Sequence, residues 1–142
     1  TASAKEIGTL LAGKRGLVIG IAMTIDCLGL RQAFHALGAE VAVTYLNEKA
    51  RPHVEPLARQ IEAPLLLPLD VLQDGQIEAV FERFTQAWGQ LDFVLHSIAY
   101  SPKEALGGRV VDVEKPGFLT TMDVSCWSFI RTAHLAEPLM KN

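Results

Sequence analysis

Residues 14–47 constrain this chain most, because two short apolar runs there flank a polar turn and an amphipathic segment. The first apolar run, residues 16–22, precedes the turn, and the second run, residues 41–45, follows Gly38. A glycine at the end of an amphipathic segment is typical of a helix C-terminus. The order strand, loop, helix, strand predicts a βαβ unit that opens a nucleotide-binding sheet.

Strand and helix patterns keep alternating beyond this unit. Apolar spacing predicts helices over 49–61 and 74–88, the second one capped by Asp74. Short apolar runs predict strands over 65–69 and 93–98. This alternation predicts an α/β fold, a doubly wound, Rossmann-like parallel sheet with the strand order 3-2-1-4.

The last part of the chain is predicted to be a loop followed by a long helix. Residues 101–117 contain Pro and Gly and are typical of a loop that covers a site. Residues 118–140 predict a helix that packs its larger apolar residues inward. These expected buried residues are Met122, Phe129, Ile130, Ala133 and Leu139.

The predicted sheet is incomplete. Residues 1–13 form a polar lead-in, and residues 14–142 form the N-terminal part of one dinucleotide-binding domain. In the order 3-2-1-4 the apolar strand over 93–98 lies at an edge, and natural proteins avoid bare apolar edges. We therefore expect a fifth strand to follow, so that this chain is the first half of a larger sheet.

Composition disfavours several classes of partner. The chain is 49% hydrophobic, as expected for strands buried on both faces, and its net charge of −3 comes without a basic block, so nucleic acid is not an expected partner. No apolar stretch reaches the roughly 18 residues of a membrane helix. Without a secretory signal, Cys27 and Cys126 are expected to be reduced thiols in a cytoplasmic protein. The four histidines lack metal-ligand spacing, so no metal site is expected.

Candidate binding residues gather where the strand order reverses, because doubly wound sheets bind ligands at the carboxyl ends of strands at that point. The turn after Gly20 and residues 45–47, 70–71 and 97–99 converge there. A glycine lets the backbone approach a pyrophosphate, an aspartate can accept from an adenine amine, and small residues leave room for a nicotinamide ribose. An Asp after a strand caps a turn more often than it binds a ligand, so the convergence of the segments carries this prediction.

Several runs resemble one family specifically. LPLDV at 67–71, SIAYSP at 97–102 and DVSCWSF at 123–129 are similar to motifs of the bacterial NADH-dependent enoyl-acyl-carrier-protein reductases. This family is a divergent branch of the short-chain dehydrogenase/reductases, and the resemblance extends over nearly the whole chain. It implies hydride transfer from NADH to the β-carbon of a trans-2-enoyl thioester in fatty acid biosynthesis. It also implies the acyl carrier protein as substrate carrier and a homotetramer.

The resemblance also implies roles for individual residues. Ser101 occupies the small-residue position that meets the acyl substrate. Ser125 stands where the wider superfamily has an active-site Asn, and either a structural or a catalytic hydroxyl fits that place. The positions that resemble cofactor contacts are Gly20, Leu46, Asp70, Val71, Ser97, Ile98 and Ala99.

The loop after Gly20 departs from the family pattern, because the segment between Gly20 and Gly29 is one residue shorter. One alignment puts Asp26 at the family's serine, where two anions about 5 Å apart would repel each other by several kcal/mol at low dielectric constant. The other puts Ile25 there, with the loss of a hydrogen bond worth about 1–2 kcal/mol. Either Thr24, which precedes Ile25, takes the role through a tightened loop, or cofactor affinity is impaired, or residues 23–28 do not represent the genuine sequence.

No catalytic pair is predicted within these 142 residues. The family's Tyr-x6-Lys pair, which stabilises the enolate and holds the ribose, has no counterpart after Tyr45 or Tyr100. Tyr45 and Lys49 have the Tyr-x3-Lys spacing of the wider superfamily, but they follow the second strand, at the adenosine end. We expect this polypeptide alone to be inactive.

Three hypotheses follow from the sequence. The leading one is the cofactor-binding half of an enoyl-acyl-carrier-protein reductase, either as a true short chain or as part of a longer one. The second is a nucleotide-binding protein of the superfamily without reductase activity, and the third is a subunit that pairs with a longer relative through residues 118–140. Because no acidic residue closes the second strand, NADPH is not excluded beside NADH.

Overall fold

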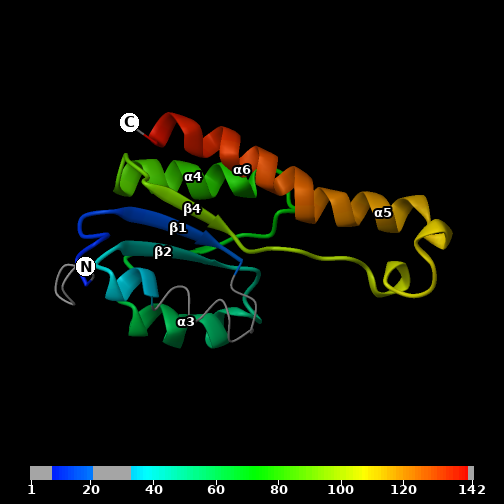
Figure 1. Ribbon diagram of the computed structural model, residues 1–142, viewed down its shortest axis with the longest axis horizontal. Helices are drawn as coiled ribbons and strands as arrows, with labels where there is room; N and C mark the ends of the chain where they lie inside the picture. Colours follow the sequence, from blue (N-terminus) through cyan, green and yellow to red (C-terminus); the bar gives the residue numbers. More distant parts are fainter. Residues whose placement is uncertain (1–7, 21–32, 141–142) are drawn as a thin grey trace, which may run out of the picture.

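The computed structural model describes residues 8–20 and 33–140 and shows a four-stranded parallel sheet between helices (Figure 1). The strands pair in the order β3-β2-β1-β4, and each neighbouring pair is parallel. This arrangement confirms the predicted doubly wound fold and its strand order. The strand bounds are β1 (Arg15–Ile19), β2 (Glu40–Tyr45), β3 (Leu66–Pro68) and β4 (Phe93–His96).

Helices cover both faces of the sheet (Figure 1). α3 (Arg51–Gln60) packs on one face, and α4 (Gln76–Ala87) and α6 (Ser128–Ala136) pack on the other. Because side chains alternate along a strand, Leu17 and Ile19 of β1 join the core beneath α4, whereas Val18 joins the core beneath α3. The strand sequences are therefore continuously apolar because both faces of the sheet are buried.

Two predicted helix starts were wrong by one or two residues. Asp74 does not cap α4, because Gly75 takes the N-cap position with a left-handed φ of 80° and no side-chain cap is formed. α3 begins at Arg51 rather than at residue 49, because Asn47 forms a turn in which its Oδ1 accepts from the Ala50 N–H at 3.0 Å. The short polar side chain there competes with the helix for the backbone N–H groups.

The end of the chain forms one helical rod. It consists of α5 (Lys115–Met122), a π-helical turn (Asp123–Trp127), α6 and a 3₁₀ turn (Glu137–Leu139). The predicted loop before it is present and contains two short 3₁₀ turns, Lys103–Ala105 and Val110–Asp112. It ends earlier than predicted, because α5 begins at Lys115 rather than at residue 118. Among the described residues no helix has the length and apolar character to cross a membrane.

The predicted buried side of this rod is wrong except for Leu139. Met122, Phe129 and Ile130 are 41%, 55% and 52% exposed, and Ala133 is also exposed. The buried residues on the rod are instead small or carry hydroxyls: Val124, Ser128, Thr132 and Ala136, with Leu139 at its end.

Close packing against β4 and α4 explains this inversion, because small side chains let the rod approach the sheet. The Ser128 hydroxyl donates to the Val124 carbonyl at 2.6 Å and lies 2.8 Å from Nε2 of His96 on β4. A buried hydroxyl with both partners satisfied costs little, so hydroxyls replace apolar residues on the inner side. The large apolar side chains consequently face outward.

Candidate functional site

A cleft of about 560 Å³ lies at the carboxyl ends of the strands, where the strand order reverses. Its walls come from the ends of β1 and β2, the turn after β3, the segment after β4 and the π-helical turn. This volume is within the range of sites that bind small molecules and cofactors. The cleft is therefore the candidate functional site.

Seven of the predicted cofactor residues line this one cleft: Gly20, Leu46, Asp70, Val71, Ser97, Ile98 and Ala99. Thr24 and Ile25 lie outside the described residues. Ser101 does not line the cleft, but it follows the lining segment directly, and its hydroxyl lies 2.8 Å from that of Thr121.

Gly20 joins the ends of β1 and β4. Its φ is 82°, and a Cβ atom there would lie 2.6 Å from the Ser97 carbonyl oxygen. The Ser97 N–H donates to the Ile19 carbonyl at 2.8 Å, and the Gly20 N–H donates to Thr44 Oγ1 at 3.1 Å. Only glycine fits this backbone, so the cleft floor here is bare main chain that a ligand can approach.

Asp70 shapes the turn after β3 as well as lining the cleft. Its Oδ1 accepts from the Leu72 N–H at 3.0 Å, and its own N–H donates to Gln76 Oε1 at 2.8 Å. The bond from the Leu72 N–H to Oδ1 caps the turn, which is the more common role of an aspartate that follows a strand. A carboxylate has two oxygens, so Oδ2 can accept from a ligand while Oδ1 holds the turn.

Tyr45 is engaged away from the cleft. Its hydroxyl donates to Glu48 Oε1 at 3.0 Å, and the Arg51 guanidinium lies 5.9 Å from the ring centroid. Burial, together with the Glu48 hydrogen bond and charge, raises the pKa of Tyr45. A buried phenol with a raised pKa beside a carboxylate is a poor proton donor at neutral pH.

Sequence reasoning missed several lining residues, of which Thr44 and Val124 carry the clearest roles. Thr44 is buried and accepts from Gly20. The sequence signal that could have identified Thr44 was a hydroxyl side chain within the apolar run 41–45. Val124 enters the cleft wall from the π-helical turn, for which the sequence offered no local signal.

No group of three or more His, Cys, Asp or Glu in the described part of the chain is arranged to hold a metal ion.

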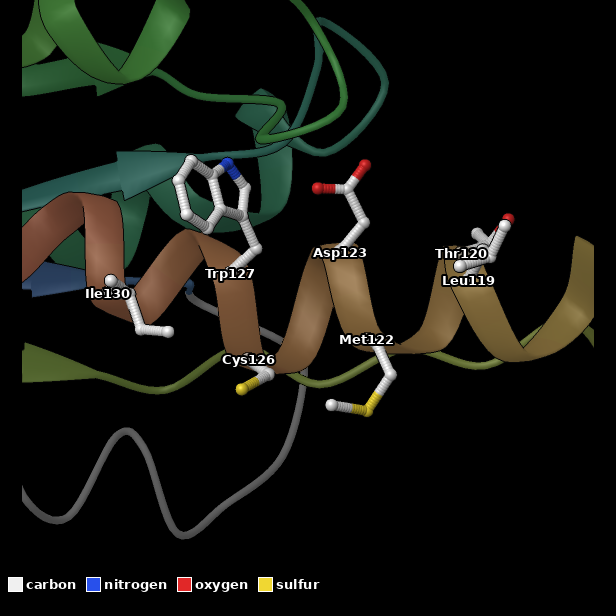
Figure 2. A pocket seen from close by; sticks show the side chains of 7 residues that line it. All are labelled: Leu119, Thr120, Met122, Asp123, Cys126, Trp127 and Ile130. Atoms are coloured by element: carbon white, nitrogen blue, oxygen red, sulfur yellow. The ribbon is translucent and has the colours of Figure 1, made fainter.

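A second hollow, of about 530 Å³, lies on the outward side of the rod. Figure 2 shows that its lining side chains all come from this one rod: Trp127 and Asp123 extend to one side, and Met122 and Cys126 extend to the other. Leu119, Thr120 and Ile130 complete the lining. Its surface is mainly apolar, in contrast to the hydroxyl-bearing inner side of the same rod.

Comparison with protein families gives a match over residues 20–142 to the family described as enoyl-(acyl carrier protein) reductase. The chain is 40% identical over 132 residues to enoyl-[acyl-carrier-protein] reductase [NADH] 2 of Rhizobium meliloti, covering 92% of this chain and 49% of that protein. It is 37% identical to the FabI enzyme of Salmonella typhimurium, covering 92% of this chain and 50% of that protein. The chain thus spans about half the length of the curated relatives it matches.

Solved structures give the same result. The reductase of Anaplasma phagocytophilum, solved in complex with NAD, superposes with a TM-score of 0.87 at 43% identity and covers 93% of this chain and 51% of that chain. The reductase of Aquifex aeolicus superposes with a TM-score of 0.89 at 36% identity, covering 94% of this chain and 53% of that chain.

Proposed function

Because this chain belongs to the enoyl-acyl-carrier-protein reductase family, a branch of the short-chain dehydrogenase/reductases, we propose that it forms the cofactor-binding part of an NADH-dependent enoyl-acyl-carrier-protein reductase. The observation that carries the proposal is the convergence of seven candidate cofactor residues on one cleft at the strand ends. Residues 14–142 would be the N-terminal part of a single dinucleotide-binding domain. The pathway would be fatty acid biosynthesis.

The described residues fit a dinucleotide. Gly20 leaves bare backbone at the cleft, and Asp70 offers a carboxylate oxygen to an adenine amine. Small residues at Ser97 and Ala99 leave space for the nicotinamide end, and Thr24 or Ile25 would face the pyrophosphate. NADH supplies a hydride when bound, and NADPH is the alternative cofactor. Ser101, just beyond the cleft wall, would contact the acyl chain.

The reduction needs groups that this chain does not provide. The hydride adds to the β-carbon of the enoyl thioester, the double-bond electrons move to the thioester oxygen as an enolate, and a proton then adds to the α-carbon. A Tyr and a Lys at the family spacing would stabilise that enolate. Position 52, seven residues after Tyr45, is Pro, and position 107, seven after Tyr100, is Gly. These 142 residues alone should therefore bind NADH without turning over.

The outward face of the rod supports a homo-oligomer, and we propose the tetramer of the family. Large apolar side chains gather there, with Trp127 and Ile130 both more than half exposed. Such a patch on one helix face is typical of a surface that a partner covers. A second copy of the same rod fits best, because like apolar faces pair across a two-fold axis. The expected compartment is the cytoplasm.

A reductase-inactive nucleotide-binding protein is the second candidate, favoured by the segment between Gly20 and Gly29 that is one residue shorter than in the family. The intact mass of the natural protein, NADH titration by fluorescence and NADH oxidation with an enoyl thioester separate the two. A mass roughly twice 15.5 kDa with turnover supports the reductase. A mass near 15.5 kDa should accompany NADH binding without turnover. A full-length protein that binds NADH weakly or not at all and does not reduce the thioester supports the second candidate and overturns the reductase, whereas tight NADH binding with turnover overturns the second candidate.

A further inference from the structure

The inner side of the rod carries a row of hydroxyls that contacts the chain leaving β4. Thr121, Ser125 and Ser128 are spaced i, i+4 and i+7, which places them on one side of a helix. Their partners follow one another from the last residue of β4 into the segment after it, in the opposite direction. Ser128 lies 2.8 Å from His96 Nε2, Ser125 contacts Tyr100, and Thr121 lies 2.8 Å from the Ser101 hydroxyl.

Ser125 pairs with both backbone groups of Tyr100. The Tyr100 N–H donates to Ser125 Oγ at 3.2 Å, and the Ser125 hydroxyl donates to the Tyr100 carbonyl at 3.3 Å. Tyr100 lies beyond the end of β4, so these backbone groups have no sheet partner among the described strands. One side chain thus supplies the donor and the acceptor that a neighbouring strand would otherwise provide.

The π-helical turn allows two consecutive residues of the rod to serve different purposes on its inner side, one in the cleft wall and the other at Tyr100. Consecutive side chains of a regular helix diverge by about 100°, so they do not normally serve the same side. Val124 is nevertheless buried in the wall of the cleft while Ser125, the next residue, contacts Tyr100. Both lie within the π-helical turn Asp123–Trp127, a feature that often occurs at functional sites.

The segment that this row holds includes one wall of the candidate site. Residues 97–100 line the cleft, and Ser101 stands at the predicted substrate position. Tyr100 lies between residues 97–99 and Ser101, so its backbone position sets the spacing between the cofactor and the substrate contacts.

From these contacts we infer that Ser125, assisted by Thr121, is a positioning residue that fixes the segment 97–101 against the rod and so sets the geometry of reduction. Neither hydroxyl belongs to the cleft lining, so both act through the segment that they hold. The effect on turnover rests on the proposed reductase function. The effect on the backbone of Tyr100 does not depend on it.

The test uses Ser125→Ala in the full-length protein, with Ser125→Thr as the conservative variant. Thr120→Ala is the matched control, because the Thr120 hydroxyl lies on the same rod but donates only to the Pro116 carbonyl of its own helix. Hydrogen–deuterium exchange of peptides covering 97–102 should be about tenfold faster in Ser125→Ala. Steady-state kinetics should show kcat/KM for the enoyl thioester lowered about tenfold, while the Kd for NADH changes less than threefold. Ser125→Thr should restore both values, and Thr120→Ala should resemble the wild type.

Two results would overturn the inference. One is unchanged exchange at 97–102 in Ser125→Ala, and the other is an equal loss of kcat/KM in Thr120→Ala, which would indicate general weakening of the rod. If the wild-type protein reduces no enoyl thioester, the proposed function fails, and the exchange measurement still decides whether Ser125 holds Tyr100.

Discussion

Gly20 and Ser97 bring the ends of β1 and β4 so close together that a Cβ atom on residue 20 would lie 2.6 Å from the Ser97 carbonyl oxygen. The obstacle is backbone, which cannot rotate away as a side chain could. The contact also sits at the cleft where the candidate cofactor residues converge. Residue 20 therefore couples the stability of the sheet to the shape of the site.

Gly20→Ala should destabilise the protein and weaken NADH binding together. The left-handed φ alone costs an alanine about 1–2 kcal/mol, and the clash with Ser97 adds to it. Gly108→Ala is the matched control, because Gly108 has a φ of 80° with no atom within 4 Å of an added Cβ. Chemical denaturation should show a larger loss for Gly20→Ala than for Gly108→Ala. Equal losses would mean that backbone strain, rather than the close approach to Ser97, determines the effect.

Asp70→Asn and Asp70→Ala should separate the turn role of this residue from its ligand role. Asparagine keeps an Oδ1 that can accept from the Leu72 N–H, so its unfolding free energy should stay within about 0.5 kcal/mol of the wild type. Its NADH affinity should fall about tenfold, because an amide nitrogen replaces an acceptor oxygen. Asp70→Ala should lose both stability and affinity. If fluorescence titration shows unchanged affinity for Asp70→Asn, Asp70 serves the turn alone.

Protonation of His96 should lower the stability of the protein as the pH drops below neutrality. Burial lowers the pKa of this histidine in the folded state, where Ser128 and Phe129 of α6 pack against the ring. The unfolded state therefore binds a proton first, so this contribution is complete above the unfolded pKa of about 6.5 and is lost as the pH falls through the lower folded value. Urea unfolding at a series of pH values measures the slope.

His96→Gln should flatten that slope, since an amide does not titrate. His53→Gln is a suitable control, because His53 is exposed on α3, on the opposite face of the sheet. A slope that survives in His96→Gln, or that disappears in the control, would contradict the assignment.

Ile130→Glu should dissociate the proposed oligomer without unfolding the subunit. Ile130 is 52% exposed on the outward face of the rod, so a charge there disturbs the subunit little but would be buried in a paired rod. Val110→Glu, at an exposed apolar position in the loop before α5, is the control. Sedimentation analysis should show smaller species for Ile130→Glu only. Identical assembly of the two variants would place the interface elsewhere.

The alternation of apolar runs and amphipathic segments was sufficient to predict the fold, including the strand order. Parallel strands buried on both faces must be continuously apolar, and crossovers between them have one hand, so few topologies remain. The sites predicted at strand ends came together in the cleft for the same reason, because the ends of parallel strands share one edge of the sheet. That Gly20, Leu46, Asp70 and Ser97 would lie at this edge could be predicted without knowledge of side-chain packing.

The orientation of the last helix was decided by tertiary structure. The apolar periodicity predicted that Met122, Phe129 and Ile130 face the core. In the structure the hydroxyls of the rod lie toward β4, and these large apolar side chains are exposed. Ser128 can be buried because His96 and the Val124 carbonyl satisfy its hydroxyl, and these partners meet only in the folded chain. Local patterns in the sequence were enough to predict the strands and the edge of the sheet where their carboxyl ends meet. The packed structure decided which side of the rod is inside, because hydrogen-bond partners distant in sequence set the cost of burial.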